Sequence, residues 1–154
     1  MEGLGTLLRK LLDTLDGAVQ SHYDAHDLNF RPRFYPVAKL LLAEGALSIR
    51  TLANAVGVSH SALSQTVSEM RSAGLVTSSP GKDGRERLVR LTDDGLKACA
   101  ELEAVWAAIA RAAAALDAEL PMPLSDLLRE TIARLQAESF VSRIEEQLQG
   151  RVVS

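Results

Sequence analysis

The chain has 154 residues and a formal net charge of −3, and 47% of its residues are hydrophobic while only 4% are aromatic. This length suits one domain with a proper core, and this composition is typical of a helix-rich globular protein. The slight excess of anions excludes a polycation that binds nucleic acid indiscriminately. The single cysteine, Cys99, excludes an intrachain disulfide and fits a reducing compartment.

The N-terminal stretch mixes leucines with charged residues. We expect an amphipathic helix from about Glu2 to Val19, because Arg9, Lys10 and Asp13 interrupt the apolar run that a signal peptide needs. No apolar run approaches the roughly 20 residues of a membrane span. The sequence therefore predicts a cytoplasmic protein with no membrane partner.

Residues 47–80 are the most informative segment and predict two short helices, a tight turn and a strand. Gly57 supplies the turn, and Ser59 can cap a second helix that ends near Ser72. A stripe of apolar residues at three- and four-residue steps predicts the buried face of that second helix. Its members are Ala62, Leu63, Val67 and Met70.

The other face of the second helix is polar. Short hydrogen-bonding side chains with one cation are what base edges and phosphates require from a helix in a major groove. With the cap residue, the predicted DNA contacts on this helix are Ser59, His60, Ser61, Ser64, Gln65, Ser68 and Arg71. Glu69, on the same helix, is expected to face solvent.

A basic β-hairpin is predicted after this helix. Gly74 ends the helix, residues 75–77 form a strand, residues 80–85 form a polar turn, and Arg87 to Leu91 forms the returning strand. This order of elements is that of a winged helix-turn-helix, whose flexible tip suits a minor groove. Lys82, Arg85 and Arg87 are the predicted DNA contacts of the hairpin, and Asp83 is expected to orient Arg85.

Charge is distributed unevenly along the chain. Residues 48–90 hold six cations and three anions, so this segment carries +3 and the remainder carries −6. A basic module on an acidic body is expected when only one face of a protein meets phosphate.

The end of the hairpin resembles a known signature. Asp83-x-Arg85, followed after five residues by Leu91-Thr92-x-x-Gly95, is similar to the wing-to-helix signature of the MarR-type transcriptional regulators, and the resemblance extends over nearly the whole chain. It implies that the first and last helices form a dimer and that a long helix joins them to the DNA-binding module. The expected fold is mainly α with a small β-hairpin wing. We expect a single MarR-like domain over 1–154, with dimerisation helices at 1–30 and 121–150, the winged helix-turn-helix at 33–91 and a linking helix at 92–120.

The apolar stripes of the flanking helices favour a dimer independently of the family resemblance. Thr92 caps a long helix, Pro121 and Pro123 end it, and one last helix begins at Leu124. The apolar stripes of these helices exceed what one small module can cover, so a second copy is the simplest partner. A two-fold dimer would place two recognition helices roughly 34 to 36 Å apart, which matches a pseudo-palindromic operator in double-stranded DNA.

Four residues before and after the first loop suggest a ligand site. His22, Tyr23, His26 and Tyr35 could line a pocket between the dimer helices and the DNA-binding module, where the resembled family often binds small aromatic or anionic effectors. The alternative is that they are linker and interface residues. A metal site is not expected, because His22 and His26 lack a third ligand nearby, and no cofactor is predicted. Cys99 lies on an apolar stripe, which favours packing, and the sequence leaves a redox role open.

The predicted function is that of a sequence-specific DNA-binding transcriptional regulator, a homodimeric repressor released by a small-molecule effector. The alternative is a winged helix that contacts protein and does not bind DNA. An enzyme is not predicted: the nearest match to an acetyltransferase pyrophosphate turn, Arg71 to Val76, ends in Val, and no P-loop, nucleophile elbow or paired catalytic carboxylates are present.

Overall fold

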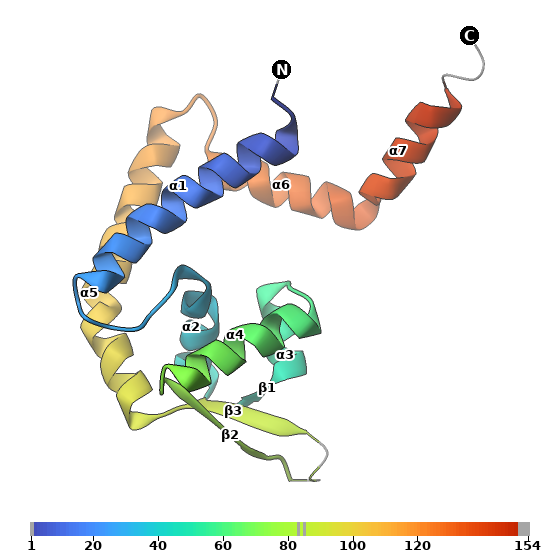
Figure 1. The fold of residues 1–154 in the computed structure, drawn as a ribbon. Coiled ribbons are helices and arrows are strands. Elements are labelled where there is room, and N and C mark those ends of the chain that lie inside the picture. Colours follow the sequence, from blue (N-terminus) through green and yellow to red (C-terminus); the bar gives the residue numbers. More distant parts are fainter. Residues whose placement is uncertain (1, 83, 85, 151–154) are drawn as a thin grey trace. The chain divides into compact units, whose positions relative to one another are not determined.

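The structure is a computed structural model, and it describes residues 2–82, 84 and 86–150. Its elements are α1 (Leu4–Asp24), the 3-10 turn η1 (Pro32–Phe34), α2 (Tyr35–Glu44), β1 (Leu47–Ser48), α3 (Ile49–Val56), α4 (His60–Ser72), β2 (Val76–Pro80), β3 (Arg87–Leu91), α5 (Asp93–Glu119), α6 (Leu124–Ala137) and α7 (Phe140–Gln149) (Figure 1). The chain forms two compact units, Met1–Ala107 and Ala108–Ser154. This mainly helical fold with one small sheet confirms the predicted fold class.

The sheet has three antiparallel strands in the order β1-β3-β2, so the hairpin β2–β3, called the wing below, gains a third strand that was not predicted. Val76 pairs with Leu91 and Pro80 pairs with Arg87. The predicted strand therefore exists, but its bounds of 75–77 and the placement of Pro80 in the turn are wrong. Proline can occupy this place because β2 is an edge strand, where a missing N–H breaks no ladder.

The helix-turn-helix is built from local capping chemistry. The Ser48 hydroxyl accepts a hydrogen bond from the backbone N–H of Thr51 at 3.1 Å, and the Ser59 hydroxyl accepts one from the N–H of Ala62 at 3.2 Å. Between the two helices, Gly57 adopts a left-handed conformation with φ of +77°, which few other residues tolerate. These contacts confirm the predicted cap and turn.

The buried face of α4 packs into the core of the first unit. Leu63, Val67 and Met70 are each at most 3% exposed, Leu52 of α3 is fully buried, and α3 and α4 are in contact. Ala62 is exposed, so its predicted place in the buried stripe is wrong. Successive residues of a helix are turned by about 100°, which moves Ala62 off the line that Leu63, Val67 and Met70 share.

A tight joint connects α4 to α5. Gly74 has φ of +75°, and the N–H of Leu75 bonds the carbonyl of Met70 at 2.9 Å, so α4 ends in a Schellman-type motif. The Thr92 hydroxyl donates to the Gly74 carbonyl at 2.6 Å and accepts from the N–H of Gly95 at 2.9 Å. Thr92 therefore caps α5, as predicted, and also fixes its start to the end of α4.

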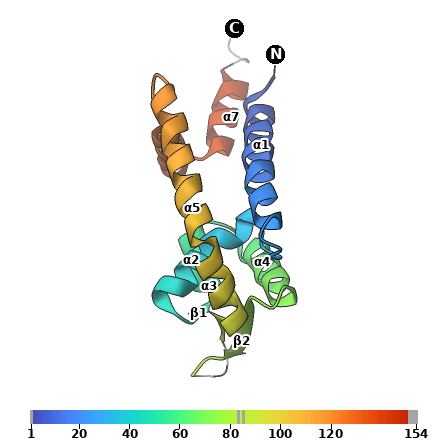
Figure 2. The same cartoon turned by 90° about the vertical axis from the view of Figure 1, so that its left-hand side faces the viewer.

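An aromatic cluster joins α1, the connector at residues 25–34, and α5. Tyr23, Phe30 and Phe34 are each 1% exposed, and the Phe30 ring lies 5.1 Å from that of Tyr23 and 5.7 Å from that of Trp106. The Trp106 indole N–H donates to the Tyr23 hydroxyl at 3.1 Å. Figure 2 shows the first half of α5 running beside the helix-turn-helix and the sheet.

The second unit holds the last part of α5 with α6 and α7. Asp117 accepts hydrogen bonds from Ser125, including one from its backbone N–H at 3.2 Å, and these bonds lower the pKa of the Asp117 carboxyl. The prediction of one last helix is wrong, because the chain leaves helical geometry at Glu138 and the Ser139 hydroxyl caps α7. Within the described residues, no helix is both long and apolar enough to cross a membrane.

Candidate nucleic-acid interface

The polar face of α4 is presented to solvent. Leu63, Val67 and Met70 anchor the opposite side of the helix, so the side chains between them are turned outward. The predicted contacts His60, Ser61, Gln65, Ser68 and Arg71 are exposed, and Ser64 is half-buried. This row of donors and acceptors has the length and chemistry of a helix that enters a major groove.

The hydroxyls at the start of α4 are partly engaged within the chain. Ser59 uses its oxygen to accept from the N–H of Ala62, and it also lies 3.2 Å from the hydroxyl of Ser61. Nδ1 of His60 lies 3.4 Å from the hydroxyl of Ser64. Ser59 therefore has a structural task, whereas His60 and Ser61 remain accessible to a phosphate at the helix N-terminus.

The wing lies next to α4 along the same side of the module (Figure 1). Its turn is closed by a 2.6 Å hydrogen bond from the N–H of Gly81 to the carbonyl of Glu86. Lys82 and Arg87 are exposed there, as a phosphate contact requires. Arg85 and Asp83, which the sequence predicts for the tip, lie outside the described residues.

An ion pair between α3 and the wing was not predicted as part of the site. Nη2 of Arg50 lies 2.8 Å from Oε1 of Glu86, and both side chains remain largely exposed. The pair borders a shallow hollow of about 360 Å³ between α3, α4 and the wing. The hollow is lined by Ser48, Ile49, Arg50, His60, Glu86 and Arg87. One feature of the sequence could have indicated this pair. Arg50 stands in the first turn of α3, where the helix dipole favours an anion and not a cation.

A second ion pair reaches α4 from the connector. The Arg33 guanidinium pairs with the carboxylate of Glu69, whose side chain is 29% exposed. Glu69 therefore faces solvent only in part, because its carboxylate is held by Arg33. The pair ties the segment that follows α1 to α4.

The four predicted effector residues lie at the end of α1, in the connector and at the start of α2. Tyr23 is buried, and its hydroxyl is occupied by Trp106; burial raises the pKa of Tyr23. Tyr35 is 38% exposed and its ring lies 5.1 Å from that of Trp106, whereas His22 and His26 are exposed. The aromatic residues are thus brought together around Trp106, and the histidines are not part of that cluster.

A nearby hollow of about 330 Å³ has other walls. It is lined by Asp16, Gly17, Gln20, Arg31, Pro32 and Arg33, and none of the four predicted effector residues is among them. Sequence reasoning missed Arg31 and Arg33 because they stand in a segment with no regular periodicity.

The described His, Cys, Asp and Glu side chains support neither a metal site nor a reactive thiol. In the part of the chain that the structure describes, no three His, Cys, Asp or Glu side chains gather to hold a metal ion. Cys99 is 3% exposed on the packed face of α5, and burial raises the pKa of its thiol, which disfavours the reactive thiolate.

The family model that matches this chain covers only its middle part. A family model described as an iron-dependent transcriptional regulator, Rrf2, matches residues 37–94, which is little more than the winged module. Iron is held by clustered Cys, His or carboxylate ligands, and the described residues bring no three of these together. No curated protein matches the chain.

Solved structures match far more of the chain. The MarR family transcriptional regulator SPO1453 from Silicibacter pomeroyi is 28% identical over 86% of this chain and 94% of its own, with a TM-score of 0.62. The PcaV transcriptional regulator from Streptomyces coelicolor, solved with its natural ligand, is 26% identical over 88% and 93%, with a TM-score of 0.62. The regulator MosR from M. tuberculosis, solved with DNA, shares the fold at 20% identity over 92% and 99%, with a TM-score of 0.70. The chain therefore has the fold of the MarR-type transcriptional regulators and is similar to them along most of its length.

Proposed function

We propose that this chain is a DNA-binding transcriptional regulator that recognises a pseudo-palindromic operator as a homodimer and represses the adjoining genes. The observation that carries the proposal is the exposed polar face of α4 beside a cationic wing, on a fold shared with regulators. Base reading falls to Gln65, Ser64 and Ser68, and phosphate contact to His60, Ser61, Arg71, Lys82, Arg85 and Arg87. Such a protein acts on DNA in the cytoplasm and has no catalytic task.

The test is a selection of bound sequences from random DNA at about 0.15 M salt, followed by titration against a scrambled duplex. A specific regulator should prefer its selected site at least about a thousandfold. Binding should weaken steeply as salt rises, because each phosphate contact releases counterions. Recovery of no sequence, with no salt-dependent DNA binding, would contradict the proposal and favour a winged helix that contacts protein.

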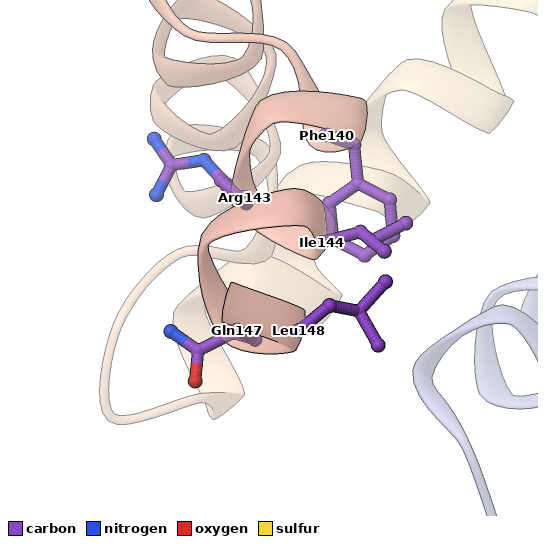
Figure 3. Close-up of a pocket in the computed structure, with 5 residues that line it drawn as sticks. All are labelled: Phe140, Arg143, Ile144, Gln147 and Leu148. Atoms are coloured by element: carbon purple, nitrogen blue, oxygen red, sulfur yellow. The ribbon is translucent and has the colours of Figure 1, made fainter. Parts of the chain in front are cut away.

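The dimer is proposed from uncovered apolar side chains. In α1, Leu4, Leu7, Leu8, Leu12 and Leu15 are each at least 44% exposed. Figure 3 shows Phe140, Ile144 and Leu148 of α7 pointing to one side of the helix, with Arg143 and Gln147 on the other. A row of exposed apolar side chains on each of these helices marks an interface.

We assign residues 1–30 and 121–150 to the dimer, 33–91 to DNA binding and 92–120 to the link between them, within one MarR-like domain. Sedimentation of the wild-type chain should give twice the monomer mass. Ile144→Asp should shift the equilibrium toward monomer and weaken operator binding, because one half-site contributes far less affinity than two. A monomeric wild type at micromolar concentration would refute the assignment.

Small-molecule release is proposed for the region around Trp106. PcaV was solved with a natural ligand, and in this chain Tyr23 and Tyr35 gather around the only tryptophan. His22 and His26 are exposed, and we keep them in the proposed site. Titration with small aromatic carboxylates, followed by Trp106 fluorescence and by operator release, tests the site. Release without any change in fluorescence would place the ligand elsewhere.

A further inference from the structure

The ion pair between Arg50 of α3 and Glu86 of the wing places a cation where the stability of the helix does not favour one. Arg50 is the second residue of α3, where the positive end of the helix dipole repels a cation. Its side chain is 75% exposed, so it is not held there by packing. Glu86 supplies an opposite charge, with its carboxylate 2.8 Å from the guanidinium.

The position of Glu86 is fixed by the wing. Its carbonyl accepts the 2.6 Å hydrogen bond from Gly81 that closes the hairpin, and the next residue, Arg87, begins β3. This hydrogen bond fixes the backbone of Glu86, and with it the point from which the Glu86 side chain extends. The carboxylate therefore meets Arg50 without relying on the tip of the wing.

The surroundings of the pair are those of a phosphate site. The hollow beside it is bordered by His60 at the start of α4 and by Arg87 at the start of β3, so groups that donate hydrogen bonds converge from three elements. Among the described residues that line this hollow, Glu86 is the one that repels a phosphate. It is also the group whose two oxygens most resemble a phosphate as a partner for guanidinium.

Building on the proposed function, we propose that Arg50 contacts a DNA phosphate and that Glu86 occupies Arg50 in the free protein, so that the two anions exchange on binding. Glu86 is then a positioning residue that limits affinity for all DNA. It reads no base, because the contact it gives up is to backbone.

The exchange makes a specific energetic prediction. Breaking an exposed ion pair costs little, so Glu86→Gln should tighten binding by only about two- to fivefold. The gain should be equal for the selected operator and for a scrambled duplex. Arg50→Ala should weaken binding to both duplexes and lower the slope of affinity against salt by about one unit.

The experiment compares the wild type, Glu86→Gln, Arg50→Ala and the double variant on both duplexes, by fluorescence anisotropy over a range of salt concentrations. Glu103→Gln is the matched control, because it removes the same charge from an exposed position of α5 and should leave affinity unchanged. In the Arg50→Ala background, the gain from Glu86→Gln should shrink by at least half. Melting curves confirm that each variant is folded.

The outcomes separate this inference from the proposed function. Equal gains from Glu86→Gln with and without Arg50 would overturn the exchange, because the carboxylate would then act by simple repulsion. Weaker binding of Glu86→Gln would also overturn it and would assign the pair to holding the wing in place. A wild type that binds neither duplex would overturn the proposed function together with this inference.

Discussion

Gly95 is the position where the smallest substitution should have the largest structural effect. A Cβ at this residue would lie 2.0 Å from the carbonyl oxygen of Leu75 and 3.2 Å from Cδ2 of Leu91. The leucine side chain can move, but the carbonyl accepts a 3.0 Å hydrogen bond from the N–H of Thr92. Gly95→Ala must therefore push α5 away from the end of α4 and break that bond.

The magnitude follows from three terms. Overpacking of a rigid site costs about 1 to 3 kcal/mol, and a backbone oxygen at this distance favours the upper end. Loss of the Thr92 hydrogen bond adds about 1 kcal/mol. Alanine returns about 1 kcal/mol through its higher helix propensity. The net loss of unfolding free energy is about 2 to 3 kcal/mol, which for a chain of this length lowers Tm by roughly 5 to 10 °C.

Thermal and urea unfolding, followed by circular dichroism and by Trp106 fluorescence, measure this loss. The matched control is Gly17→Ala, because Gly17 is also helical and its added Cβ would meet nothing within 4 Å. That variant should gain up to about 1 kcal/mol. If Gly95→Ala melted at or above the wild-type temperature, the close approach of α5 to Leu75 would not be a constraint and the reasoning would fail.

Three further predictions concern the site and the core. Gln65→Ala should lower the preference for the selected operator over a scrambled duplex by about 1 to 3 kcal/mol, and equal losses on both duplexes would exclude base reading there. Lys82→Ala should weaken binding to both duplexes alike and lower the salt slope by about one unit, as shown by anisotropy titrations. Tyr23→Phe should cost about 1 to 3 kcal/mol in urea unfolding, because it leaves the buried Trp106 N–H unpaired. Since burial raises the pKa of Tyr23, its contribution is complete below the ordinary value of 10.0 and is lost as pH rises through the raised pKa; the variant should show a smaller alkaline loss.

Local chemistry explains why the helix-turn-helix could be predicted. Gly57 needs a left-handed conformation and Ser59 needs an unpaired N–H three residues ahead, and both requirements are met within one turn of chain. The same holds for Thr92, whose hydroxyl caps α5. Such features depend on near neighbours only, so a single sequence contains all the information they require.

Elements that depend on distant partners were predicted less well. The strand β1 has only two residues and exists because Leu47 and Ser48 pair with β3, some 40 residues later. The break between α6 and α7 has neither Gly nor Pro to mark it. In the described chain, α6 and α7 bury no apolar side chain. The spacing of apolar residues therefore reflects no packing within the chain that would reveal where α6 ends and α7 begins.

The candidate site also combines features set by near neighbours with features set by distant partners. The exposed face of α4 follows from helix periodicity, so its residues were predicted, with Ser64 only half-exposed. The pairs Arg50–Glu86 and Arg33–Glu69 each join residues 36 positions apart, and both depend on how the wing and the connector fold back. Long-range ion pairs of this kind follow from tertiary structure, which a single sequence does not display.

The contacts of α4 define what any regulatory signal has to move. Its C-terminal end is fixed to α5 through Gly74, Leu75 and Thr92, and the helix is fixed to the connector through Glu69 and Arg33. The connector is in turn packed on Trp106 by Phe30, within the aromatic cluster proposed as the effector region. A ligand that displaces this cluster would therefore act on the recognition helix through two attachments at once. For that reason we expect Arg33→Ala, which removes one attachment, to leave operator binding nearly intact while reducing the effect of an effector on it.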